Sequence, residues 1–143
     1  MSDDGVALAR IAREAITVDE CEQAVDSSAH GAVVTFAGVV RDHDEGRGVV
    51  RLAYEAHPDA PTALAGSARR IAERFPEVRV AAVHRVGDLV VGDLALSCAV
   101  ASAHRAAAFE ACAALVDDIK ASVPIWKEQS FVDGSSEWVA SLG

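Results

Sequence analysis

Lys120 and Lys127 are the only two lysines in this chain of 143 residues, whose other permanently charged basic side chains are arginines. The chain also lacks asparagine, so a biased base composition is one explanation for the loss of lysine elsewhere. Arginine stays protonated, whereas a lysine that is desolvated or crowded by other cations can lose its proton and act as a base or nucleophile. The retained pair therefore indicates chemistry that arginine cannot perform, although two ordinary surface lysines would give the same count.

Further basic side chains occur beside elements that could position them. Arg41 follows a β-branched run, His84 and Arg85 lie within another apolar run, and His104 and Arg105 precede a helical pattern. The formal net charge of −9 argues against a nucleic-acid partner, because binding to phosphate backbones requires a clustered basic face. We therefore expect a local basic pocket for a small anionic ligand or an anionic chain end.

Length and composition favour one compact domain spanning residues 1–143. The hydrophobic fraction is 51% and the mean hydropathy is +0.20, which is typical of a globular protein. No apolar run reaches the roughly 18 residues needed to span a bilayer. The acidic N-terminus, residues 1–4, is unlike a secretory signal, so we expect a cytoplasmic protein. Cys21, Cys98 and Cys112 have no CxxC spacing, so neither a zinc site nor a disulfide framework is expected.

Periodicity predicts a mixture of strands and helices, and hence an α+β fold. The expected strands are 6–16, 31–40, 49–56, 78–86 and 93–101, and the expected helices are 17–28 (opened by a capping box, TVDE), 58–75 and 104–122. Strands 31–40 and 49–56 are expected to form a hairpin with a glycine-containing tip. Strands 78–86 and 93–101 are expected to pair antiparallel, and strand 31–40 ends next to Arg41.

The predicted helix 104–122 separates two groups of candidate residues. Its apolar face is expected to carry Phe109, Cys112, Val116 and Ile119. At about 1.5 Å rise per residue, His104 and Arg105 at its start lie roughly 22 Å from Lys120. One small ligand cannot reach both ends, so if both bind the same molecule a second copy must contribute one end, in a symmetric dimer. The positive N-terminus of this helix is also a natural seat for phosphate.

Several ordered motifs resemble the large, catalytic subunit of molybdopterin synthase. The resemblance extends from about residue 6 to Val139. The motifs are GAVVTFAGVVRD at 31–42, LAYEA at 52–56, HRVG at 84–87, VGD at 91–93, SAHRAAAF at 102–109 and KASVPIWKE at 120–128. Their number, their order and the uncommon Pro-Ile-Trp-Lys string make the resemblance specific.

The resemblance implies an α/β-hammerhead fold with an additional antiparallel β subdomain. It implies a homodimer at the centre of a heterotetramer, with a small ubiquitin-like sulfur-carrier subunit at each end. In that family the carrier's C-terminal Gly-Gly bears a thiocarboxylate, which sulfurates cyclic pyranopterin monophosphate twice and gives the dithiolene of molybdopterin. No metal or organic cofactor is implied for this step.

The resemblance also implies which residues form the substrate pocket. They are Val39, Val40, Arg41, His104, Arg105, Lys120, Lys127, Glu128 and Gln129. Arg41, His104 and Arg105 would hold the phosphate and the polar pterin edge through charge-assisted hydrogen bonds. Lys120 and Lys127 would be catalytic, since they would neutralise the thiocarboxylate and the developing oxyanion while one of them transfers a proton. The resemblance leaves open which lysine does which.

Other prominent residues are interpreted as structural. They are His84 and Arg85 inside a predicted strand, Tyr54 and Glu55 in the predicted hairpin, and Trp126 and Trp138 as interface or core anchors. The sequence departs from the family pattern at residues 57–60, which are HPDA where many relatives have YPMA. It also ends shortly after Val139, where relatives often continue with a basic tail, so a contact from that tail is expected to be missing or replaced.

Two other classes of function fit the same cations. One is a lysine Schiff-base enzyme acting on a small phosphorylated carbonyl compound, which borohydride trapping would detect. The other is a non-catalytic dimer that only docks the C-terminal carboxylate of a partner. Substitution of either lysine by alanine distinguishes an enzyme from a docking module. An enzyme would lose turnover while the complex still forms, whereas a docking module would lose at most affinity.

Overall fold

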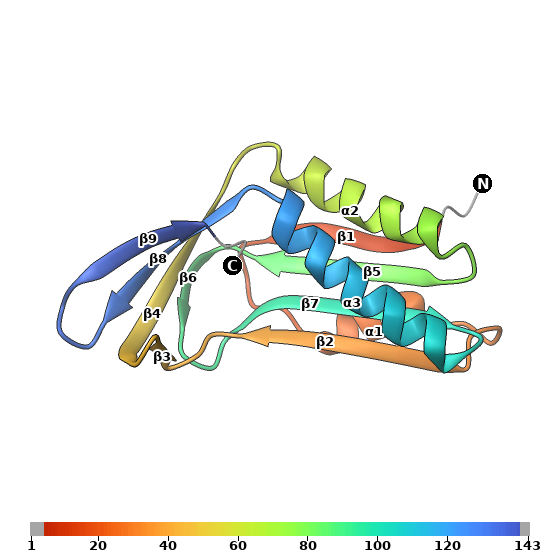
Figure 1. The fold of residues 1–143 in the computed structure, drawn as a ribbon, viewed down its shortest axis with the longest axis horizontal. Coiled ribbons are helices and arrows are strands. Elements are labelled where there is room, and N and C mark those ends of the chain that lie inside the picture. The colour runs from red at the N-terminus through yellow and green to blue at the C-terminus, as the bar shows by residue number, and fades with distance from the viewer. Residues whose placement is uncertain (1–4, 141–143) are drawn as a thin grey trace.

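The computed structural model describes residues 5–140, which form two β-sheets and three helices (Figure 1). The elements are β1 Val6–Ala12, α1 Val18–Val25, β2 Ala32–Val39, β3 His43–Asp44, β4 Arg47–Ala56, α2 Ala60–Arg74, β5 Arg79–Arg85, β6 Gly87–Val90, β7 Leu94–Ser102, α3 Arg105–Ser122, β8 Ile125–Phe131 and β9 Ser136–Ala140. The predicted α+β class is confirmed. Among these residues no helix is both long and apolar enough to cross a membrane. The two terminal segments used in the predictions, residues 1–4 and 141–143, lie outside the described part.

The first sheet has the strand order β1-β5-β7-β2, and helices cover both of its faces. β1 pairs with β5 in parallel, and the predicted antiparallel pairing of β5 with β7 is confirmed. Alternate side chains of β5 enter different clusters: Val80 and Ala82 pack with α2 and α3, whereas Ala81 and Val83 pack with α1. Burial on both faces explains why these two central strands are almost continuously apolar.

The helices follow the sequence signals closely, with one exception. Thr17 caps α1 by accepting a hydrogen bond from the Glu20 N–H at 3.2 Å, as its capping box predicts, and α1 ends at Val25. Asp118 of α3 accepts hydrogen bonds from Ser67 and Arg70 of α2, both at 2.6 Å, which fixes the two helices together. Phe109, predicted to share one apolar face of α3 with Cys112 and Ile119, is 62% exposed, whereas those two residues are buried.

The second sheet is antiparallel and has the order β3-β4-β8-β9, with β6 on the β3 side of β4. The predicted hairpin between β2 and β4 is wrong. β2 pairs with β7 in the first sheet, and the chain after Arg41 crosses to the second sheet. The hairpin at this point is instead β3–β4, where Glu45 and Gly46 both have positive φ (49° and 81°), as a two-residue turn requires.

Both tryptophans lie on the outer face of this sheet. Trp126 is 43% exposed and Trp138 is 56% exposed, so neither anchors the core. An interface role remains a prediction.

The two sheets meet where β5 continues into β6. Gly87 has φ +99°, which allows the chain to leave the first sheet and pair with Tyr54 of β4 in the second. His84 of β5 contacts Tyr54 edge-on, with ring centroids 5.2 Å apart. The imidazole is 6% exposed, and desolvation, a backbone hydrogen bond and the charge of Lys120 together set the pKa of His84 at about 4 instead of the usual 6.5.

This buried imidazole should make stability depend on pH. The unfolded chain protonates His84 as pH falls below about 6.5, whereas the folded chain resists protonation down to about pH 4, so stability is lost as pH falls through this window. Between pH 7 and pH 5 this one group should lower the free energy of unfolding by about 2 kcal/mol. Urea titrations of the unmodified chain and of His84→Gln at both pH values measure it, since the variant should lose less stability on acidification. Equal losses in the two proteins would show that other groups cause the effect.

Candidate active site

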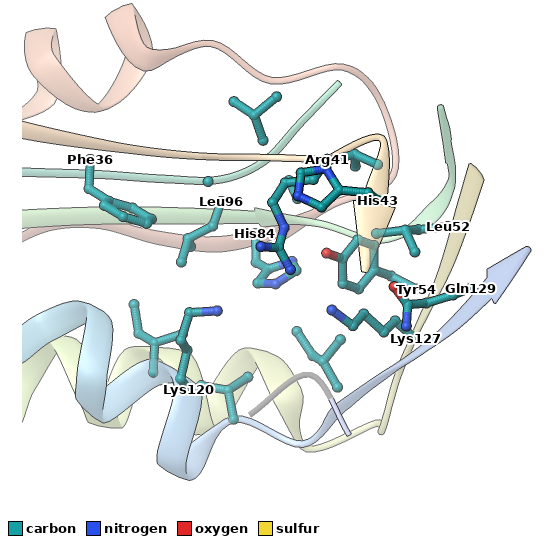
Figure 2. A pocket seen from close by; sticks show the side chains of 17 residues that line it. Phe36, Arg41, His43, Leu52, Tyr54, His84, Leu96, Lys120, Lys127 and Gln129 are labelled. Atoms are coloured by element: carbon teal, nitrogen blue, oxygen red, sulfur yellow. The ribbon is translucent and has the colours of Figure 1, made fainter. Parts of the chain in front are cut away.

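A pocket of about 340 Å³ opens at the junction of the two sheets (Figure 2). Its walls come from the end of β2, from β4, β5 and β7, from the last turn of α3, and from β8. The lining residues are Phe36, Gly38, Val39, Val40, Arg41, His43, Leu52, Tyr54, His84, Ala95, Leu96, Ile119, Lys120, Val123, Ile125, Lys127 and Gln129. Apolar side chains form much of the wall, and the charged groups enter from three different elements. The size suits a small molecule or the end of an extended chain.

The two lysines point into this pocket from different elements (Figure 2). Lys120 lies in the last turn of α3 and Lys127 lies on β8. Pro124 cannot continue the helix, and its carbonyl accepts a hydrogen bond from the His57 N–H at 3.0 Å, which fixes the break between the two elements. Burial lowers the pKa of Lys127, and the charges of Lys120 and Arg41 lower it further, against an opposite effect of Asp44.

Alternation along β8 determines which of its polar side chains reach the pocket. Lys127 and Gln129 line it, whereas Glu128 lies on the opposite face of the strand and does not. The Gln129 amide donates a hydrogen bond to Asp44 at 2.8 Å, and Asp44 lies 3.6 Å from the Arg41 guanidinium. The β3 turn therefore supplies a carboxylate that orients both Gln129 and Arg41 at the rim.

His104 and Arg105 lie at the other end of α3 from this pocket, which only the last turn of the helix lines. His104 is the N-cap residue of α3, and both side chains are exposed. A single chain therefore brings together Val39, Val40, Arg41, Lys120, Lys127 and Gln129 of the predicted set, but leaves His104, Arg105 and Glu128 outside. The separation predicted from the length of the helix is present in the structure.

Three polar residues of the pocket were absent from the predicted set: His43, Tyr54 and His84. His43 is bound to Asp42 at 2.8 Å on the exposed β3 turn. Tyr54 shares the inward face of β4 with Leu52, and burial raises the pKa of its phenol. The strand periodicity places Tyr54 on that face, but no sequence signal places His84 at the junction of two sheets.

The cysteines do not contribute to the pocket. Cys21, Cys98 and Cys112 are all buried, and none of them lines it. Desolvation raises the pKa of each thiol, most strongly for Cys98, so the reactive thiolate is disfavoured in all three. Among residues 5–140 no three His, Cys, Asp or Glu side chains are grouped so that they could hold a metal ion. The available chemistry is therefore that of amines, a guanidinium and neutral polar groups.

Comparison with known proteins agrees with this geometry. The family described as MoaE protein matches residues 11–122. The molybdopterin synthase catalytic subunit 1 of Mycobacterium tuberculosis is 39% identical over 131 residues, which cover 91% of this chain and 88% of that protein. The crystal structure of molybdopterin synthase from Staphylococcus aureus superposes with a TM-score of 0.86 at 36% identity, covering 92% of this chain and 96% of that one.

A more distant structure shares the fold alone. It is a chain from the protein–protein complex of subunits 1 and 2 of molybdopterin-converting factor from Helicobacter pylori, with a TM-score of 0.67 and 20% identity over 92% of this chain and 88% of that one. The family match over most of the chain, and the 39% identity to a curated relative along 88% of its length, lead to one assignment. This chain belongs to the MoaE family, the catalytic subunits of molybdopterin synthase.

Proposed function

We propose that this chain transfers sulfur from the C-terminal thiocarboxylate of a small carrier subunit to cyclic pyranopterin monophosphate, forming the dithiolene of molybdopterin. The observation that carries the proposal is the pocket in which Arg41, Lys120 and Lys127 converge, in a member of the synthase family. Three cations suit a substrate phosphate and a thiocarboxylate, both of which are anionic. We place this reaction in the cytoplasm.

The sulfur is best supplied from outside this chain. A sulfurtransferase that carries sulfur on its own cysteine needs an accessible thiolate, and all three cysteines here are buried with raised pKa values. A carrier that brings sulfur on its own chain end does not have this requirement. The two-subunit complex of the H. pylori protein, which has the same fold, supports such a partner.

The two lysines take different roles in this proposal. The thiocarboxylate sulfur would bond to a substrate carbon and displace the oxygen substituent there. Water would then add to the carrier's carbonyl carbon, giving an oxyanion that expels the sulfur, now bonded to the substrate, and leaves a carboxylate on the carrier. Lys120, in the last turn of α3, would stabilise the negative charge. Lys127 would carry the proton, because burial and the neighbouring cations lower its pKa and so make its neutral amine easier to form than that of an ordinary exposed lysine.

A second copy of the chain completes the site in this proposal. Among the described strands β2 pairs only with β7, so its other edge is free. Its sequence, AVVTFAGV, contains neither a charged residue nor a proline that would protect such an edge, and Val33 and Val39 are each at least 40% exposed. Helix α3 packs across β2 and β7, and its residue Phe109 is exposed as well. A monomer leaves this apolar edge uncovered, and a second copy would cover it.

Two-fold pairing along β2 would bring the separated groups together. Ala32 pairs with Ser102, next to His104, whereas Val39 at the other end of β2 lines the pocket. An antiparallel contact between two copies of β2 exchanges these ends. His104 and Arg105 of the second copy would then approach the pocket that holds Lys120 and Lys127, where they could bind the phosphate.

The first prediction concerns the lysines. Lys120→Ala and Lys127→Ala should each reduce turnover by about a hundredfold or more, because an oxyanion-stabilising charge or a proton carrier is lost. Lys127→Arg should remain impaired because arginine keeps the charge but does not release its proton, whereas Lys120→Arg should retain more activity. The measurement is a single-turnover assay with thiocarboxylated carrier and cyclic pyranopterin monophosphate, with gel filtration to verify the complex.

Arg69→Ala is the matched control, since Arg69 is an exposed cation of α2 outside the pocket. The control should behave like the unmodified chain. Unchanged turnover in the lysine variants would refute their roles, and no turnover by an unmodified chain that still binds the carrier would favour a docking module. If borohydride treatment in the presence of substrate leaves the substrate covalently attached to a lysine, Schiff-base chemistry is favoured instead.

The second prediction tests the shared site. Lys120→Ala and Arg105→Ala chains should each be nearly inactive alone, but co-refolding them in equal amounts should restore about a quarter of the normal activity. Half of the dimers then contain one chain of each kind, and one of the two sites in such a dimer combines an intact Lys120 with an intact Arg105. If each site lay within one chain, the mixture would stay inactive.

A further inference from the structure

His84 is a buried polar group of the pocket to which the proposed reaction gives no role. It lies on β5 at the inner wall, between the two lysines in the close view and beside Tyr54 (Figure 2). Its side chain is 6% exposed, so it is among the most buried polar groups of the described chain.

The hydrogen bonding of His84 fixes the tautomer of its ring. Nδ1 lies 2.8 Å from the Arg85 carbonyl oxygen, which can only accept, so Nδ1 carries the proton. In the neutral imidazole Nε2 is then an acceptor. No group among residues 5–140 donates a hydrogen bond to Nε2, and the residue is part of the pocket lining.

The charged side chains around His84 Nε2 are hydrogen-bond donors and not acceptors. Arg41, Lys120 and Lys127 donate hydrogen bonds and hold anionic groups, but while charged they cannot accept a hydrogen bond from a ligand. A ligand with both anionic oxygens and N–H or O–H donors needs an acceptor as well. We propose that His84 is a specificity-determining residue, whose Nε2 accepts a hydrogen bond from an N–H or O–H group on the ring system of the substrate.

This inference rests on the proposed function for the identity of the ligand. It divides the pocket into two parts: cations that recognise the phosphate and the thiocarboxylate, and a neutral acceptor at the inner wall that recognises the heterocycle. The imidazole stays neutral near pH 7 because burial disfavours its charged form. A carboxylate at this position would also accept, but it would pair with Lys120 or Lys127 and neutralise the charge that the reaction needs.

Two substitutions at His84 test the roles of the two ring nitrogens separately. His84→Asn keeps a donor near the Nδ1 position, facing the Arg85 carbonyl, but removes the atom that faces the pocket. His84→Gln loses the Nδ1 donor but extends its amide oxygen to the position of Nε2. The probe is cyclic pyranopterin monophosphate, titrated first into the protein without carrier to obtain Kd, and then used with thiocarboxylated carrier to obtain kcat and KM.

The Asn variant should weaken binding of the pterin and raise KM by about ten- to a hundredfold, because a donor of the ligand is left unpaired in a desolvated site. The Gln variant should stay within a few-fold of the unmodified chain, and kcat should change little in either. Two results would overturn the inference: a pterin affinity of the Asn variant equal to that of the unmodified chain, or a larger loss of affinity in the Gln variant than in the Asn variant. If His84 were purely structural, the variant that loses the hydrogen bond to the Arg85 carbonyl, Gln, would be the more impaired. A different result is that the unmodified chain binds the pterin through Nε2, as the two variants would show, and yet forms no product. That result would refute the proposed sulfur transfer and leave the role of His84 standing.

An NMR measurement on the unmodified chain keeps the inference testable if either variant fails to fold. The ¹⁵N resonance of His84 Nε2 should have the shift of an unprotonated nitrogen in the free protein, and it should move upfield on addition of the pterin as Nε2 accepts a hydrogen bond. Inorganic phosphate, which lacks the ring donors, is the control and should leave the resonance unchanged. A pterin-saturated protein with an unshifted Nε2 resonance would overturn the inference.

Discussion

The mutual repulsion of Arg41, Lys120 and Lys127 is the constraint that the rest of the site has to meet. Three like charges in a partly desolvated space destabilise one another, and the charges of Lys120 and Arg41 add to burial, the main cause of the lowered pKa of Lys127. Asp44 offsets part of this repulsion, since it faces Arg41 and binds Gln129. The pocket therefore favours an anionic ligand, and occupation by phosphate or thiocarboxylate would relieve the repulsion.

Holding these charges close together requires rigid supports from distant parts of the chain. Arg41 follows the end of β2, Lys120 lies in the last turn of α3, and Lys127 lies on the inward face of β8. The first two supports belong to the layer of β1, β5, β7 and β2 with its helices, and the third belongs to the second sheet. The pocket consequently depends on how the two sheets are joined, and the contact between His84 and Tyr54 lies at that joint.

Local patterns in the sequence predicted most of the helices and the first sheet, because those elements are amphipathic or continuously apolar. The capping of α1 by Thr17 and the pairing of β5 with β7 are examples. The second sheet was harder to predict. β8 reads IWKEQSF and β6 is only four residues long, so neither has a strong periodic signal, and the partner of β2 depends on contacts far away in the sequence.

The same division applies to the site. The lysines and Arg41 are recognisable from residue type, spacing and family motifs, and alternation along the strand explains why Gln129 enters the pocket while Glu128 does not. His84 could not be assigned, because a histidine in an apolar strand looks like a core residue until the second sheet is placed against it. His104 and Arg105 are different, since the length of α3 already separates them from Lys120 in one chain.

The burial of the three cysteines has a further consequence for chemical selectivity. Thiocarboxylates and freshly formed enethiolates react readily with disulfides and compete with thiolates for the same partners. An exposed cysteine thiolate near the pocket could attack the substrate carbon in place of the thiocarboxylate, displacing the same oxygen substituent and linking the protein to the substrate. With Cys21, Cys98 and Cys112 enclosed in the core, the walls that a sulfur intermediate meets are amine, guanidinium, imidazole, phenol, amide and hydrocarbon. The fold thus keeps the protein's own sulfur atoms apart from the sulfur that it handles.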